Sequence, residues 1–137
     1  MEQLRIPANI EQLGAVMEFV DEVLERGDCP LEIRTLIDVA VEEIFVNIAS
    51  YAYTSDKGVA ELNAGFEGEP RRVVITFKDS GVPYDPLEKP DPDISLSAEE
   101  RSVGGLGIFL VKQIMDKVGY RYENGQNILT LEKRLSV

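Results

Sequence analysis

Histidine is absent from the 137 residues of this chain, and cysteine occurs once, as Cys29. Without histidine the chain has no His-based catalytic triad, no histidine phosphoacceptor and no His metal site. A single cysteine excludes an internal disulfide and any multi-cysteine metal cluster. Long apolar runs are also missing: none approaches the roughly 18 residues of a membrane span, and the first residues lack the charged and apolar regions of a secretory signal. We therefore expect a cytoplasmic protein without a membrane segment.

Basic residues are scarce relative to acidic ones. The chain has 14 Lys and Arg against 25 Asp and Glu, a formal net charge of −11. This excess argues against direct binding of nucleic acids or anionic membranes, which need basic residues to neutralise phosphates, but it leaves room for a local site that binds one nucleotide. A hydrophobic fraction of 44% excludes a wholly disordered chain. The length predicts a single domain over residues 1–137.

The order of the apolar patterns predicts an α+β fold. Apolar residues recur at helical spacing in some segments and alternate in others. The order β-α-α-β-β-loop-α-β-β favours a two-layer α/β sandwich, with a largely antiparallel mixed sheet and helices on one face, over a doubly wound parallel fold. The expected elements are a strand at 3–6, helices at 9–25 and 31–51, strands at 58–66 and 72–78, a helix at 108–117, and a hairpin at 120–134 that turns at Asn124-Gly125.

Regular pattern disappears between Val82 and Val103. This stretch holds four of the seven prolines and many acidic residues. A loop of this length inside a compact domain is uncommon, and it is more often a lid or a binding loop than a passive connection. The sequence therefore predicts a loop with a function here.

The first pair of residues that could carry chemistry is Glu43 and Asn47. Residues four apart lie within about 40° of each other on a helix, so both side chains point the same way. A carboxylate and a carboxamide one turn apart can divide two tasks, one accepting a proton and the other ligating a metal. The alternative is an ordinary solvated edge of the helix. Glu42 points to a different side, toward Asp38, and serves as the comparison.

The second motif begins at Asp79, directly after the predicted strand at 72–78. An aspartate at a strand end can accept a hydrogen bond from an exocyclic amine such as that of adenine. Gly81 lets a ligand approach the backbone closely, and Pro83 and Pro86 restrict the exit of the chain. The alternative is an Asp-Gly turn that closes the strand.

The third motif is Gly104-Gly105-Leu106-Gly107, which leads into the predicted third helix. Glycines before a helix expose backbone N–H groups, and the positive end of the helix dipole adds to the attraction for phosphate. The run is not a Walker loop, and it is not a dinucleotide fingerprint, because a charged loop rather than a strand precedes it. A phosphate site and a flexible hinge both remain open at this point.

Taken together, the three motifs resemble those of the GHKL (Bergerat) ATPase superfamily. Glu-x-x-x-Asn on a helix is followed by Asp-x-Gly-x-Pro after a strand and by Gly-Gly-Leu-Gly at the start of a helix. The fuller segments, residues 43–47, 79–86 and 104–111, look most like the bacterial anti-sigma factor serine kinases, which have a histidine-kinase-like ATPase domain. The resemblance covers about residues 5–135, and the joint occurrence of the three motifs in this order is highly specific.

The resemblance implies a role for each motif. Glu43 matches the family's general base, and Asn47 matches its magnesium-ligating asparagine. Asp79 matches the aspartate that accepts a hydrogen bond from the adenine amine, with Gly81 beside it. The run Gly104-Gly105-Leu106-Gly107 matches the segment around the phosphates. ATP and Mg²⁺ are therefore the expected ligands.

Three further assignments follow from the resemblance. Residues 87–103 match the lid over ATP, and Arg101 within this lid is placed near the terminal phosphate. Thr130 falls where the family often has a threonine on the adenine side; the alternative is an ordinary strand residue.

The function that the resemblance implies is that of an ATP-dependent serine-protein kinase and anti-sigma factor in bacterial transcription regulation. Such a protein phosphorylates a small anti-sigma-factor antagonist and sequesters a sigma factor, and the resemblance suggests a homodimer. The alternative is a nucleotide-dependent regulatory module that binds a protein without phosphotransfer. A detached catalytic domain of a sensor histidine kinase is disfavoured, because the chain has no phosphoaccepting histidine.

Overall fold

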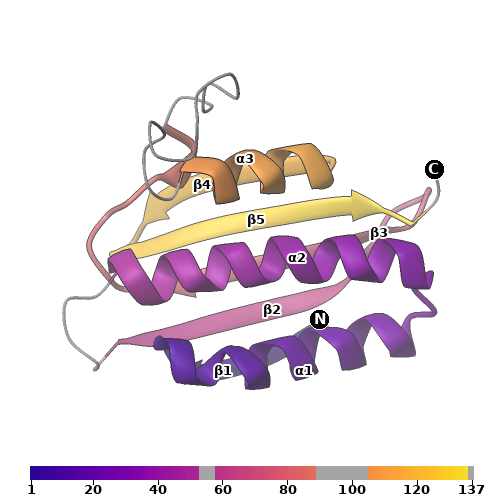
Figure 1. The fold of residues 1–137 in the computed structure, drawn as a ribbon, viewed down its shortest axis with the longest axis horizontal. Helices are drawn as coiled ribbons and strands as arrows, with labels where there is room; N and C mark the ends of the chain where they lie inside the picture. The colour runs from indigo at the N-terminus through magenta and orange to yellow at the C-terminus, as the bar shows by residue number, and fades with distance from the viewer. Residues whose placement is uncertain (53–57, 89–104, 136–137) are drawn as a thin grey trace.

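The structure, a computed structural model, describes residues 1–52, 58–88 and 105–135 (Figure 1). Within these ranges the chain forms a five-stranded sheet and three α-helices. Short 3-10 turns lie at Ile10–Gln12 and Pro86–Glu88, and a π-helix follows at Ile48–Ala52. The elements are β1 (Glu2–Pro7), α1 (Leu13–Arg26), α2 (Leu31–Asn47), β2 (Val59–Glu67), β3 (Arg72–Asp79), α3 (Gly105–Ile114), β4 (Lys117–Glu123) and β5 (Gln126–Arg134).

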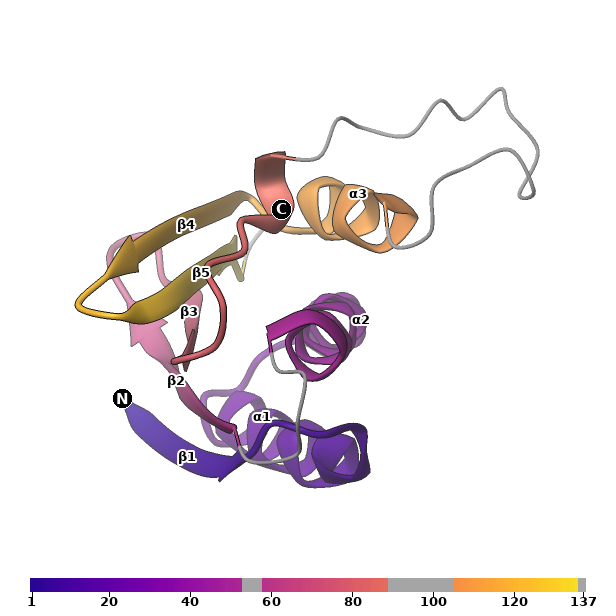
Figure 2. The ribbon, with the colours of Figure 1, turned by 90° about the vertical axis from the view of Figure 1, so that its left-hand side faces the viewer.

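The sheet is antiparallel throughout, with the strand order β1-β2-β3-β5-β4. Figure 2 shows that α1, α2 and α3 all lie on the same side of this sheet. The α+β class, the antiparallel pairing and the placement of the helices on one face are therefore confirmed. The last strand, β5, is inserted between β3 and β4, so the start of β5 lies beside the end of β3.

The core lies between the helix layer and the sheet. The residues that recur at helical spacing in α1 and α2 are buried, and alternate residues of the central strands meet them. Each helix thus buries one face, and no helix within the described ranges has both the length and the apolarity needed to cross a membrane. The fully buried residues include Val16, Val20, Ile37, Phe45, Leu62, Ile75, Phe77 and Leu131.

Local sequence explains where the elements begin and turn. The Asn9 side chain accepts a hydrogen bond from the backbone N–H of Glu11, at 3.1 Å, and so caps the turn that leads into α1. The β4–β5 hairpin turns at Asn124 and Gly125, which have φ values of 53° and 77°. Two positive φ values in a two-residue turn favour the Asn-Gly pair found here, as predicted.

The boundaries of the third helix differ from the prediction. α3 begins at Gly105 rather than Ile108, and it ends at Ile114, so Lys117 opens β4 instead of closing the helix. Glycine in a first helical turn breaks the propensity signal, but the packing of α3 against α2 favours the helix there. Lys117 leaves the helix because it pairs with Glu132 in the β4–β5 ladder.

Candidate functional site

A pocket opens where the C-terminal end of α2 meets the end of β3 and the start of β5. It lies on the helix side of the sheet, and most of its wall is apolar. A flat heterocycle is well suited to such a wall, and a few polar groups would fix its orientation. The lining residues are Ile44, Asn47, Ile48, Phe77, Asp79, Tyr84, Pro86, Tyr120, Asn127 and Leu129.

Asp79 is the buried carboxylate of this pocket. It is the last residue of β3 and is 4% exposed. Its Oδ1 accepts hydrogen bonds from the backbone N–H of Gly81, at 3.0 Å, and from Nδ2 of Asn127, at 2.9 Å. Burial raises the pKa of Asp79 above its ordinary value, and these two hydrogen bonds act in the opposite direction. A carboxylate held in this way can accept a hydrogen bond from the amine of a bound heterocycle.

Asn127 was not singled out in the sequence, yet within the described ranges it is the one buried polar residue besides Asp79, at 6% exposed. It lies directly opposite Asp79 in the β3–β5 ladder. The signal that would have found it is the alternation along β5, which places Leu129 and Leu131 on the core side and therefore places Asn127 there too. A polar residue on the core face of a strand needs a buried partner.

Thr130 is not brought to this pocket. Side chains alternate along β5, so Thr130 points to the sheet face that carries no helix, where its Oγ1 lies 3.5 Å from Oγ1 of Thr76. It lines a separate surface groove with Lys117 and Glu132. The polar residue of β5 that lines the pocket beside Asp79 is Asn127.

Glu43 and Asn47 lie on the same side of α2, as their spacing predicts. Asn47 lines the pocket, whereas Glu43 lies against the first turn of α3. A Cβ atom added to Gly107 would collide with Oε2 of Glu43 and would lie 3.1 Å from its Cδ. The comparison residue, Glu42, is exposed to solvent. The structure therefore joins the first and third motifs through a contact between Glu43 and Gly107.

The other predicted residues fall into two groups. Gly105, Leu106 and Gly107 form the first turn of α3, whose backbone N–H groups are those left without partners inside a helix. Arg101 and Gly104 lie outside the described residues, as does the predicted lid from residue 89 onward.

The whole-chain comparisons agree with this geometry. The family model described as "Histidine kinase-like ATPase domain" matches residues 6–133. This chain belongs to the histidine kinase-like ATPase family. It is similar to "Serine-protein kinase RsbW" from Staphylococcus aureus strains JH9, Newman and JH1, with 27% identity over 135 residues that cover 92% of this chain and 82% of each relative.

Two solved structures share the fold of this histidine kinase-like ATPase. The RsbU and RsbW domains of a Mycobacterium tuberculosis protein match 98% of this chain with a TM-score of 0.65 and 17% identity, and this chain spans 32% of that one. The histidine kinase domain of a blue-light activated histidine kinase from Erythrobacter litoralis EL346 matches 95% of this chain with a TM-score of 0.54 and 18% identity, and this chain spans 62% of it.

Membership of this ATPase family implies the use of ATP, and the pocket suits the adenine end of that molecule. The protein groups that could bind magnesium are fewer. Among the described residues, no three His, Cys, Asp or Glu side chains lie close enough together to hold a metal ion. Mg²⁺ often takes one or two protein ligands and completes its shell with water and phosphate oxygens. The single amide oxygen of Asn47 at the pocket fits a metal that arrives with the nucleotide.

Proposed function

We propose that this protein is an ATP-dependent serine-protein kinase and anti-sigma factor. It phosphorylates a small anti-sigma-factor antagonist, and it sequesters a sigma factor until the antagonist displaces it. The observation that carries the proposal is the juxtaposition of an apolar pocket that contains the buried carboxylate of Asp79 with the Glu43 carboxylate, which lies against the start of α3. The similarity to the RsbW serine-protein kinases supports it.

ATP lies along the groove that these elements define. The adenine amine donates a hydrogen bond to Asp79, and the phosphates lie at the Gly104–Gly107 end of α3, where backbone N–H groups and the helix dipole favour anions. The segment 87–103 is the lid, and Arg101 within it approaches the terminal phosphate. The whole chain, 1–137, acts as one domain.

Phosphoryl transfer depends mainly on positioning and on neutralising charge. Glu43 accepts the proton of a serine hydroxyl as the serine oxygen forms a bond to the γ-phosphorus. The bond between that phosphorus and its bridging oxygen breaks, and ADP leaves with the electron pair. Asn47 is the residue that would hold Mg²⁺, which supplies charge neutralisation at the phosphates when it is bound.

The kinase activity is tested with labelled ATP and candidate antagonist proteins. Loss of a general base costs about 10²–10⁴ in rate, so Glu43→Ala should nearly abolish phosphoserine formation while ATP still binds. Glu42→Ala, one residue away and exposed, is the matched control and should retain the wild-type rate. If Glu43→Ala leaves the transfer rate unchanged, the base assignment is wrong.

The alternative function is a nucleotide-dependent regulatory module that binds a protein partner without transferring phosphate. The same incubation separates the two functions, because a kinase yields phosphoserine on the partner. A complex that changes with nucleotide but never carries label would support the binding module. Capture of partners from the source organism with and without ATP would identify the sigma factor and the antagonist, and light scattering would establish the homodimer.

A further inference from the structure

We infer that Asn127 is a positioning residue that orients the Asp79 carboxylate, and that it thereby determines selectivity for a purine with a 6-amino group. The inference rests on the proposed binding of adenine at Asp79. The structure shows Asn127 in the wall of the pocket, directly opposite Asp79 in the β3–β5 ladder.

The Asn127 amide uses all of its hydrogen-bonding capacity within the protein. Its Nδ2 donates to Oδ1 of Asp79, at 2.9 Å, and to the carbonyl oxygen of Val82, at 3.1 Å. Its Oδ1 accepts from the backbone N–H of Tyr84, at 3.1 Å, and from the hydroxyl of Tyr120. An asparagine side chain has two donor hydrogens and two acceptor lone pairs, so no group of Asn127 is left for a ligand.

The chemistry of these partners also fixes which way the amide faces. The Tyr84 backbone N–H can only donate, so it must meet Oδ1 of Asn127. The Val82 carbonyl oxygen can only accept, so it must meet Nδ2. A flipped amide would break both contacts at once. Asn127 therefore presents a hydrogen-bond donor, and never an acceptor, to Asp79.

This donor determines how Asp79 faces the pocket. Both hydrogen bonds that the described residues give to Asp79, from Gly81 and from Asn127, go to Oδ1. Two donors on one oxygen fix the plane of the carboxyl group and leave Oδ2 as the oxygen that meets a ligand amine. The same contacts oppose the effect of burial on the Asp79 pKa, so they help to keep this group an acceptor.

Asn127 also joins two walls of the pocket. It binds Val82 and Tyr84, in the segment that follows β3, and it binds Tyr120 on β4. Tyr84 and Tyr120 both line the pocket. A ligand that sits between these rings and Asp79 is thus surrounded by groups that depend on one amide, although that amide has no hydrogen-bonding group left for the ligand.

The test compares the affinity for ATP with that for purine riboside triphosphate, which lacks the 6-amino group. A hydrogen bond to a charged group gives about tenfold selectivity or more, so the wild-type protein should prefer ATP by that factor. Asn127→Asp replaces the donor by an acceptor of nearly the same shape. We expect its preference for ATP to fall below about threefold, with little change in its affinity for the analogue.

Asn63→Asp is the matched control, because Asn63 lies on β2 and its Nδ2 faces Glu61 rather than the pocket. This variant should keep the wild-type preference. If Asn127 had a purely structural role, Asn127→Asp would lower the affinity for ATP and for the analogue by the same factor, and that result would overturn the inference. Retention of the wild-type preference in Asn127→Asp would also overturn it.

Tyr120→Phe provides a second measurement in case Asn127→Asp does not fold. It removes the hydroxyl that holds Oδ1 of Asn127 but keeps the aromatic ring. We expect a partial loss of the preference for ATP, about two- to fivefold, and an unchanged preference would contradict the inference. If the wild-type protein itself does not distinguish the two nucleotides, the assignment of adenine to Asp79 fails, and the inference fails with it.

Discussion

At the scale of the residue, the contact between Glu43 and Gly107 links the proposed base to the proposed phosphate site. The space that Glu43 occupies exists only because residue 107 has no Cβ. Glycine at a helix start is usually explained by backbone freedom or by close approach of a ligand. Here it has a second reason, which is that the carboxylate of a neighbouring helix packs against it.

Gly107→Ala should therefore reduce phosphoryl transfer without unfolding the protein. The new methyl group meets the flexible end of the Glu43 side chain, which can move aside, so the change in the free energy of unfolding should stay within about 1 kcal/mol. The displaced carboxylate should lower the rate of transfer at least about tenfold. A single-turnover transfer assay and urea denaturation measure the two effects.

Gly14→Ala is the control for this prediction. Gly14 also lies in a helix, α1, but a Cβ atom there would meet nothing within 4 Å. The substitution should stabilise the protein by about 0.5–1 kcal/mol and leave transfer unchanged. A wild-type transfer rate in Gly107→Ala would show that the contact with Glu43 does not position the base.

The role of Asn47 as a magnesium ligand leads to a second prediction. Asn47→Ala removes the only amide oxygen of α2 that lines the pocket in the described part of the chain. We expect the affinity for ATP to lose its dependence on the Mg²⁺ concentration, because the metal then has no protein ligand there. Isothermal titration at several Mg²⁺ concentrations measures this dependence. A titration that matches the wild-type protein would refute the ligand role.

The site residues also show what sequence reasoning misses at this scale. Asn47 and Asp79 line one pocket and Glu43 lies one helical turn from Asn47, and all three stand in motifs of distinctive spacing, so the sequence could single them out; their roles remain predictions. Thr130 lies on the other sheet face from Asn127, because the side-chain period of a strand is two and residues an odd number of positions apart face opposite sides. The ladder that pairs Asp79 with Asn127 is set by the β3–β5 register, which no local pattern reveals.

At the scale of the element, the packing of α1 on α2 contains a pair of acids. Asp21 and Asp38 lie close enough to interact, and each has an Oδ1 atom that is buried and has no hydrogen-bond partner. Burial raises the pKa of Asp38 to about 7, the side chain of Asp21 and its charge add to this shift, and Arg34 opposes it. At a pH between the ordinary value and about 7, the folded protein therefore keeps a proton on this pair that the unfolded chain releases.

The sign of the pH dependence follows from this shift. A carboxyl group with a raised pKa binds more protons in the folded than in the unfolded state, so stability falls as the pH rises from about 4 to about 7. Asp38→Asn imitates the protonated acid. It should match the wild type at about pH 5 and exceed it by about 1–2 kcal/mol at about pH 8, a modest value because the pair is only partly withdrawn from water.

Urea denaturation across this pH range tests the prediction, with Glu42→Gln, exposed on the same helix, as the control. The control should keep the wild-type slope of stability against pH. Equal slopes in wild type and Asp38→Asn would mean that Asp38 does not carry the shared proton.

The elements themselves could be predicted where one period dominates. The strand predicted at 72–78, observed at Arg72–Asp79, and the Asn-Gly hairpin were correct because alternation and turn chemistry agree there. The start of α3 was placed too late, because Gly105 and Gly107 have low helix propensity and the contact with α2 decides in favour of the helix. Packing between elements that are distant in the sequence cannot be predicted from the sequence of either segment alone.

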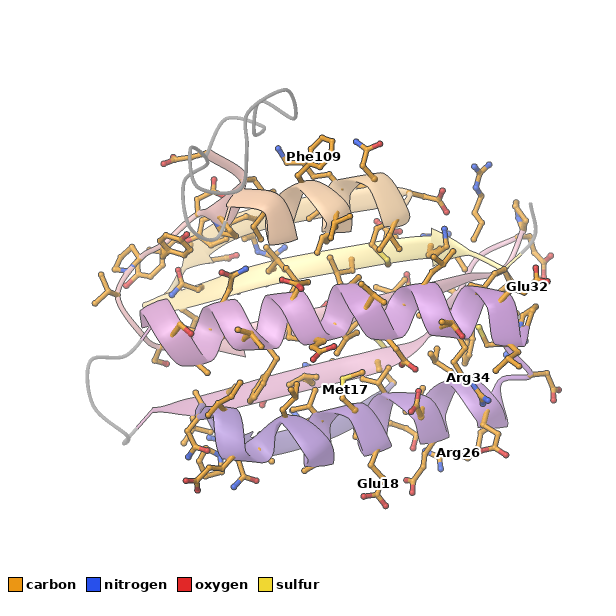
Figure 3. The ribbon with its side chains drawn as sticks, viewed as in Figure 1. Met17, Glu18, Arg26, Glu32, Arg34 and Phe109 are labelled. Atoms are coloured by element: carbon orange, nitrogen blue, oxygen red, sulfur yellow. The ribbon has the colours of Figure 1, made fainter. Side chains whose placement is uncertain are left out.

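At the scale of the whole molecule, the negative charge is unevenly distributed. The helices α1 and α2 carry eight acids and two arginines, a net charge of −6. The five strands carry six acids and seven bases, a net charge of +1. Figure 3 shows Glu18 and Arg26 extending outward from α1 and Glu32 from α2. The outer surface of the helix layer is therefore acidic, whereas the sheet is nearly neutral.

The charges of the sheet are largely paired with one another. Two of these pairs join neighbouring strands. Nε of Arg72 lies 2.6 Å from Oε1 of Glu132, and Nζ of Lys78 lies 3.9 Å from Oε2 of Glu61. Such pairs screen each other and give little long-range field. Of these two layers, α1 and α2 therefore contribute the larger negative field at a distance, and this field attracts a basic protein surface.

If the proposed sigma factor is the partner, its binding should weaken and slow as salt is added, and substitutions in α1 and α2 should change this effect most. The triple variant Glu18→Gln, Glu25→Gln and Glu32→Gln removes three exposed acids from α1 and α2. We expect its association rate constant to fall about three- to tenfold at low salt, because steering by charge acts mainly on the rate of encounter. Stopped-flow or surface-based kinetics at several salt concentrations measure it.

The matched control removes the same amount of charge from the strands, through Glu2→Gln, Glu67→Gln and Glu123→Gln, all exposed in the structure. Net charge changes equally in the two triple variants, so a difference in association rate reports where the charge lies. Equal rates would attribute steering to net charge alone, and binding that is insensitive to salt would contradict a basic partner surface. A slower rate only in the helix variant would place the incoming partner on the acidic layer that covers the sheet.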